Sequence, residues 1–171
     1  MLGLVYWHRG LVGSVAAHAC FNGMLLVAAL AASHGPPVSL AAAGASITVP
    51  AAWHAVGPAP GGVLAAVGPS GARIDLGRVD VGQPLDATVL AEDLAQGRMA
   101  PLPGATVQGS VAVLDLPAGR AVMLAATVRG HEARLVMLPR GALVWIAAVE
   151  TAGSHRAAVD FQRSLSTLGL P

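Results

Sequence analysis

The chain has 171 residues, of which 54% are hydrophobic and only 11% are charged, and its formal net charge is +1. This length allows one domain together with a membrane segment. A net charge so close to zero provides no basic field for nucleic acid, so we expect no nucleic-acid partner. The single cysteine, Cys20, excludes an intrachain disulfide.

Residues 11–33 form an uncharged apolar run, and about 20 such residues are enough for a helix to cross a bilayer core. We therefore predict one transmembrane helix within residues 1–33, a single-pass location in the cell membrane, and the lipid bilayer as a partner. Arg9 precedes the run, which places the following domain outside the cytoplasm. The alternative is a secretory signal peptide cleaved after the small-x-small sequence of residues 29–31, which predicts a secreted protein.

Two polar residues, His18 and Asn22, lie inside this apolar run. Their spacing of four places both on one face of a helix. An ionisable group at membrane depth is costly and usually faces a bundle interior, a cavity or a metal. The alternative is that His18 is a tolerated polar residue in an anchor that packs against nothing.

The segment around His18 resembles the last conserved segment of the CPBP family, the CAAX-processing and bacteriocin-processing intramembrane metalloproteases. In that family a turn with an aromatic and a basic residue leads into a helix with an H-x-x-x-N motif. The match covers about residues 2–32, and its matching residues are Tyr6, Trp7, Arg9, Gly10, His18 and Asn22. The resemblance implies that His18 is a metal ligand and that Asn22 is a catalytic residue, which hydrogen-bonds a substrate carbonyl or a developing oxyanion.

Two further motifs of that family, E-E-x-x-x-R and F-x-x-x-H, are missing from this chain. They supply the general base and the other metal ligand, and metal-assisted hydrolysis needs several ligands, an open position and a base. We therefore expect no cofactor and no activity in this chain alone. Zinc or another divalent metal would require upstream membrane helices of a split protease. The first hypothesis is thus a C-terminal fragment or relic of an intramembrane metalloprotease that carries an extracytoplasmic domain.

Residues 34–45 mix Pro, Gly, Ala and Ser without a period, which predicts a linker, and residues 46–171 form the domain. The domain starts with a short strand at residues 47–49, and residues 63–67 and 72–79 predict a hairpin. After Pro84 the period changes to that of an amphipathic helix. Its apolar face consists of Ala87, Leu90, Ala91 and Leu94.

Four strand-like runs follow, and the short turns between them predict an antiparallel meander over residues 107–116, 121–129, 133–138 and 142–150. In the last run Trp145 shares a face with Leu143 and Ala147, so we expect it to be buried. Ser154 then caps a final helix, whose inward stripe is Ala158, Phe161, Leu165 and Leu168. The fold class is α+β, an antiparallel sheet of about six or seven strands with one helix on each face.

This order of elements resembles the PsbP-like sandwich, in particular small exported actinobacterial proteins of the LpqN type. The likeness spans about residues 46–168 and rests on V-P-x-x-W and F-x-x-S-L, here Val49, Pro50 and Trp53, and Phe161, Ser164 and Leu165. That family includes many domains with no known activity. The second hypothesis is therefore a non-enzymatic binding domain, membrane-anchored or secreted. The three His residues of the domain, His54, His131 and His155, are interpreted as exposed turn residues rather than metal ligands.

Overall fold

The computed structural model describes residues 35–128 and 130–171, and the compact unit within them spans Pro37–Pro171. The predicted membrane helix within residues 1–33, including His18, Cys20 and Asn22, lies outside the described residues, so it stays a prediction. Within the two described ranges, no helix has the length and apolar character that a bilayer crossing requires.

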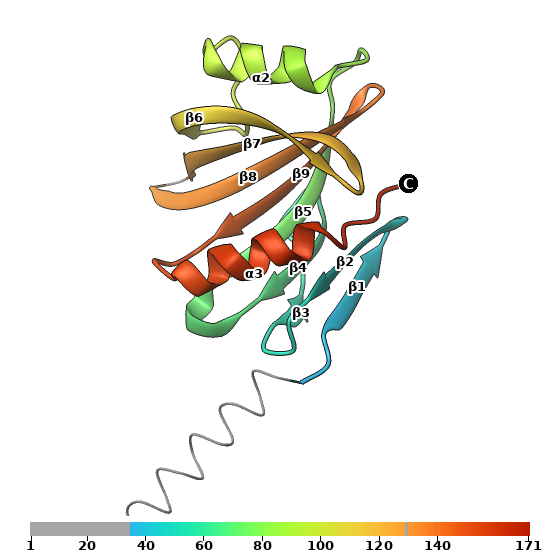
Figure 1. The fold of residues 1–171 in the computed structure, drawn as a ribbon, viewed down its shortest axis with the longest axis vertical. Coiled ribbons are helices and arrows are strands. Elements are labelled where there is room, and N and C mark those ends of the chain that lie inside the picture. The colour runs from blue at the N-terminus through green and yellow to red at the C-terminus, as the bar shows by residue number, and fades with distance from the viewer. Residues whose placement is uncertain (1–34, 129) are drawn as a thin grey trace, which may run out of the picture. The chain divides into compact units, whose positions relative to one another are not determined.

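The centre of the domain is a seven-stranded antiparallel sheet with the strand order β3-β4-β5-β9-β8-β7-β6 (Figure 1). The strands are β3 (His54–Val56), β4 (Gly62–Val67), β5 (Arg73–Asp80), β6 (Ala105–Leu116), β7 (Gly119–Val128), β8 (His131–Arg140) and β9 (Leu143–Glu150). The predicted hairpin is β4–β5, and the predicted meander is β6 to β9, with each strand beside the next. Both predictions are confirmed.

The linker predicted for residues 34–45 is wrong over most of its length. Strand β1 (Val38–Ala42) pairs with β2 (Ala45–Val49) in a separate two-stranded sheet, and Leu40 is buried in the core. The two residues between the strands, Ala43 and Gly44, have φ angles of 49° and 82°, which is the geometry of a tight two-residue hairpin turn. The domain therefore begins near Pro37 rather than near residue 46.

One helix covers each face of the large sheet, as predicted. Helix α2 (Ala87–Ala95) packs against β6 and β7, whereas α3 (His155–Leu165) packs against β9 and β2 (Figure 1). Each helix contributes its apolar stripe to a separate core: Leu90 and Leu94 of α2 to one, and Phe161 and Leu165 of α3 to the other. The predicted α+β sandwich is confirmed in this part of the chain.

The core beneath α3 brings together the two motifs that suggested a PsbP-like domain. Trp53 and Trp145 are each 1% exposed, which confirms that both are core residues. The indole Nε1 of Trp53 donates a hydrogen bond to Oδ2 of the buried Asp160 at 3.1 Å. Asp160 immediately precedes Phe161 on α3, and Trp53 and Phe161 belong to the same core. The V-P-x-x-W and F-x-x-S-L segments therefore lie next to each other in the folded domain.

The segment after α3 returns to the β1–β2 hairpin. Ser46 and Gly169 exchange two backbone hydrogen bonds, each of 2.9 Å. The backbone N–H of Thr48 donates to the hydroxyl of Thr167 at 2.9 Å. The hairpin is thereby joined to the rest of the domain by both backbone and side-chain bonds.

Helix α2 begins after Asp86, whose Oδ1 accepts a hydrogen bond from the backbone N–H of Thr88 at 2.7 Å. This bond lowers the pKa of the Asp86 carboxyl below its usual value. A lowered pKa in the folded state gives a stabilisation that is present above the unfolded-state pKa and is lost as the pH falls through the folded-state pKa.

We therefore expect the free energy of unfolding to decrease in acid more steeply for the native chain than for Asp86→Asn. The amide oxygen of asparagine caps a helix nearly as well as aspartate but does not titrate. Urea denaturation of both proteins from neutral pH into the acid range measures this. A difference between them that does not change with pH would contradict the assignment of Asp86 as the titrating cap.

Candidate functional site

A groove with a volume of about 530 Å³ lies between the start of α3 and the adjoining ends of β7 and β8. Small side chains form much of its surface, and polar and charged side chains are distributed among them. The lining residues are Gln108, Ala125, Ala126, Thr127, Glu132, Ala133, Arg134, Thr151, Gly153, Ser154, His155 and Ala158.

The floor of the groove follows from the alternation of side chains along β8. Glu132 and Arg134 point to the same face of the sheet as the core residues Val136 and Leu138, that is, toward the side of α3. On the neighbouring strand β7, the register places the small Ala125 opposite Arg134. A small residue beside a long one leaves space above the sheet, which contributes to the hollow.

The wall of the groove is the first turn of α3. Ala152 and Gly153 have φ angles of 46° and 77°, and this left-handed turn redirects the chain from β9 into the helix. Ser154 then caps the helix, because its Oγ accepts a hydrogen bond from the backbone N–H of Ala157 at 3.3 Å, as the sequence predicts. His155 follows the cap and is exposed at the groove.

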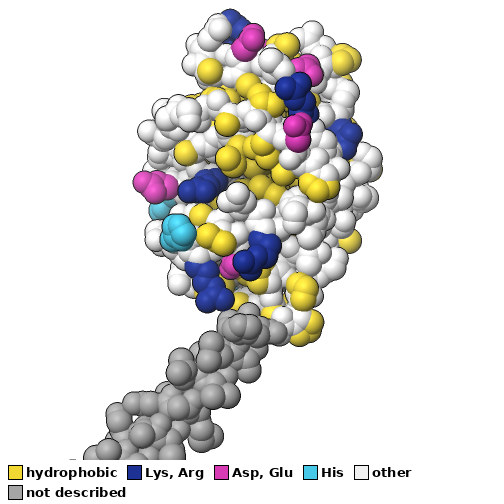
Figure 2. Space-filling view, viewed as in Figure 1, with side chains coloured by type: hydrophobic (Ala, Val, Ile, Leu, Met, Phe, Trp, Pro, Cys, Tyr) yellow, Lys and Arg dark blue, Asp and Glu magenta, His cyan; other side chains and the backbone are white. Residues whose placement is uncertain are grey.

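The charges of this groove are not paired with each other. Within residues 35–128 and 130–171, the ion pairs join Arg73 to Asp75, Arg98 to Asp93 and Arg120 to Asp115. Neither Glu132 nor Arg134 takes part in one. Figure 2 shows basic, acidic and His side chains together at the left edge of the domain, where β8 and α3 begin. The groove therefore presents both signs of charge to solvent.

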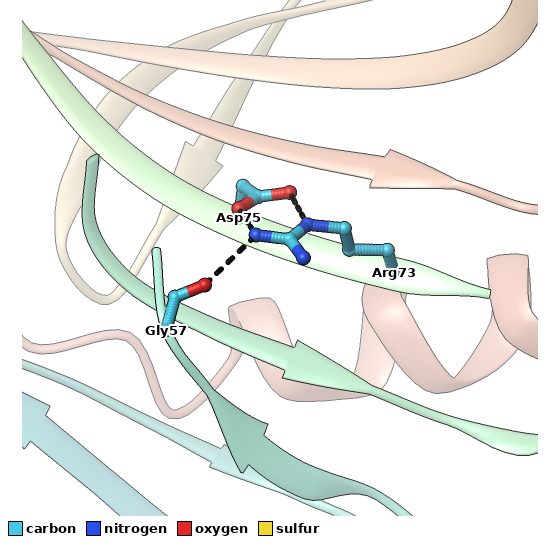
Figure 3. Close-up of polar contacts among 3 residues, drawn as sticks. All are labelled: Gly57, Arg73 and Asp75. Atoms are coloured by element: carbon cyan, nitrogen blue, oxygen red, sulfur yellow. Dashed lines mark hydrogen bonds and ion pairs between the residues drawn. The ribbon is translucent and has the colours of Figure 1, made fainter. Parts of the chain in front are cut away.

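A second groove, of about 300 Å³, lies on the other face of the sheet and is mainly apolar. The loop that forms one side of it is held by Arg73, which bonds both carboxylate oxygens of Asp75, at 2.6 and 2.8 Å, and the carbonyl of Gly57 at 3.2 Å (Figure 3). The bonds to Asp75 raise the pKa of the Arg73 guanidinium. Because these charges neutralise each other, this cluster stabilises the loop and leaves no charge free for a ligand.

The three His residues of the domain are all exposed, as predicted. His54 begins β3 and His131 begins β8, and of the three only His155 lines the larger groove. Among the residues that the structure describes, no three His, Cys, Asp or Glu side chains lie close enough to hold a metal. The predicted metal ligand His18 and catalytic residue Asn22 are outside the described residues, so their roles stay predictions.

Sequence reasoning did not single out Glu132, Arg134 or the groove position of His155. A signal was present for the first two, since Glu132 and Arg134 alternate with the buried Ala133 and Leu135 and therefore share one face. No sequence pattern indicates that α3 begins beside that face. The groove depends on a contact between segments that are distant in the sequence.

Comparisons with known proteins find similar structures but no match to a protein family or to a curated protein. The solution structure of the cyanobacterial PsbP protein CyanoP from Synechocystis sp. PCC 6803 is similar, with a TM-score of 0.57 and 13% sequence identity over 81% of this chain and 95% of that one. A crystal structure from Bacteroides thetaiotaomicron VPI-5482 has a TM-score of 0.45 and 11% identity, over 80% of this chain and 48% of that one.

The likeness to CyanoP establishes the fold: the described domain is a PsbP-like α+β sandwich, which confirms the PsbP-like part of the second resemblance and leaves its LpqN-type part a prediction. At 13% identity it establishes the fold alone. The protease resemblance of residues 2–32 receives no support from these comparisons.

Proposed function

We propose that this protein is a non-enzymatic binding domain and that the groove between α3 and β7–β8 is its ligand site. The observation that carries the proposal is a pair of opposite charges, Glu132 and Arg134, side by side in a cavity of about 530 Å³, neither of them in an ion pair with another residue that the structure describes. Binding sites for small ligands are commonly concave, have volumes of about 300–1,000 Å³, and place a few polar groups among apolar ones. The groove has these properties, whereas the second groove is mainly apolar.

We further propose that the domain acts outside the cytoplasm, anchored by residues 11–33 or secreted after their removal. The apolar run and the position of Arg9 before it support this location. The metalloprotease hypothesis stays a prediction, because its residues His18 and Asn22 belong to the part of the chain that the structure does not describe.

Titration of the ¹⁵N-labelled chain, followed by NMR, tests the binding proposal. The compounds are amino acids, short peptides, simple carboxylates and monosaccharides. We expect at least one class to shift amide signals of the groove, such as those of Ala125, Thr127 and Gly153. Arg134→Ala should weaken this binding about tenfold or more, since a hydrogen bond to a charged group contributes about 1.5–3 kcal/mol.

Arg163→Ala is the matched control, because Arg163 is an exposed arginine of α3 that does not line the groove. Its binding should equal that of the native chain. If no compound shifts the groove signals, or if the shifts occur only at the second groove around Ile146 and Leu102, the proposed site is wrong.

A further inference from the structure

We infer that the ligand of this groove is a zwitterion of dipeptide length, with its ammonium group at Glu132 and its carboxylate at Arg134. This inference rests on the proposed binding function and names the class of ligand. Three observations support it: the signs of the two charges, their spacing along β8, and the side chains around them.

The first observation is that the groove offers one charge of each sign, and neither is neutralised within the described residues. The cross-strand neighbours of Glu132 and Arg134 on β7 are the uncharged Thr127 and Ala125. A simple anion would gain from Arg134 but would be repelled by Glu132, two residues away on the same face. A simple cation would be attracted by Glu132 but repelled by Arg134. A ligand with both charges satisfies both side chains.

The second observation is the spacing of Glu132 and Arg134 along the backbone of β8. Residues i and i+2 of an antiparallel strand are about 7 Å apart, because each residue advances the strand by about 3.4 Å. An extended chain of two residues also spans about 7 Å. An extended dipeptide that runs in the same direction as β8 therefore places its two ends at Glu132 and Arg134. A single amino acid is shorter than this spacing, and a tetrapeptide is about twice as long.

The third observation is a polar group placed for the peptide bond between the two ends. Nε2 of Gln108 donates a hydrogen bond to Oγ1 of Thr127 at 3.3 Å. Through this bond the amide of Gln108 is oriented beside the floor of the groove, and its Oε1 is able to accept a hydrogen bond from the ligand N–H. The small side chains of Ala125 and Ala158 leave room for short ligand side chains.

The experiment is a titration of the full-length ¹⁵N-labelled chain with Ala-Ala, followed at the groove amide signals. Acetyl-Ala-Ala, which lacks the ammonium group, and Ala-Ala-amide, which lacks the carboxylate, are the blocked probes. Alanine and tetraalanine test the length. We expect Ala-Ala to bind at least tenfold more tightly than each of these four compounds.

Two single substitutions and one exchange test the assignment of the charges. Glu132→Gln and Arg134→Met should each weaken Ala-Ala binding about tenfold or more, and Arg163→Met should leave it unchanged. The double variant Glu132→Arg/Arg134→Glu should recover binding, because the dipeptide then binds in the opposite direction. Circular dichroism and thermal melting establish that each variant is folded.

The outcomes separate the inference from the function on which it rests. If acetyl-Ala-Ala binds the groove as tightly as Ala-Ala and Glu132→Gln strengthens it, the site is a simple anion site and the zwitterion inference is wrong. If other compounds bind the groove but Ala-Ala does not, the inference fails while the binding function stands. If no compound of any class binds there, both are wrong.

Discussion

Replacing Trp145 by alanine should reduce the free energy of unfolding by roughly 3–5 kcal/mol, the range for truncating a core aromatic residue. Trp145 is 1% exposed and lies on β9, between β5 and β8, in the core that α3 covers. The guanidinium of Arg78 lies over its ring, with Cζ 5.7 Å from the ring centroid. Urea denaturation of the native and variant chains measures the difference.

Val159→Ala provides the control for this substitution. Val159 is on α3 and is 40% exposed, so its truncation should change the free energy of unfolding by about 0.5 kcal/mol or less. A loss below about 1 kcal/mol for Trp145→Ala would contradict its role as a central core residue. An equally large loss for Val159→Ala would contradict the exposure of that face of α3.

Gly68→Ala should also destabilise the domain, although the substitution adds only one methyl group. A Cβ atom at residue 68 would lie 2.5 Å from Cε2 and 2.6 Å from Cδ2 of the Trp53 ring. The ring is buried and bonded to Asp160, so it does not move aside without loss of packing. Overpacking of this kind costs typically about 1–3 kcal/mol and sometimes more.

This prediction isolates a steric effect, because Gly68 has a φ of −107°, which any residue adopts. The matched control is Gly57→Ala, since an added Cβ there meets no atom within 4 Å. Thermal melting and urea denaturation should show a lower stability for Gly68→Ala and almost none of that loss for Gly57→Ala. In a Trp53→Leu background the cost of Gly68→Ala should decrease, and an unchanged cost there would contradict the ring contact.

The strands and helices from residue 62 onward could be predicted from the sequence because their patterns are strong. Strand β9 alternates large apolar residues, and the stripe of α3 recurs at helical spacing through Phe161 and Leu165. Strand β1 could not be predicted in this way. Its residues lie between two prolines and Gly44, two of its five are alanine, which is depleted in strands, and Leu40 is its only buried side chain.

The candidate groove could be predicted only in part. The alternation of Glu132 and Arg134 with buried neighbours places the two charges on one face of β8. The sequence does not show that His155 and the first turn of α3 border that same face, since this depends on how α3 packs against the sheet. The charged floor was thus present in the sequence pattern, whereas the cavity arises only from tertiary packing.

The pairing of Ser46 with Gly169 has a consequence for the order of folding. Thr48 and Thr167, which bond beside this pair, are 119 positions apart in the chain. During synthesis the β1–β2 hairpin therefore emerges from the ribosome long before Thr167 and Gly169 do. An isolated two-stranded hairpin is at best marginally stable in water. The bonds that join the hairpin to the segment after α3 therefore form only after almost all of the domain has left the ribosome.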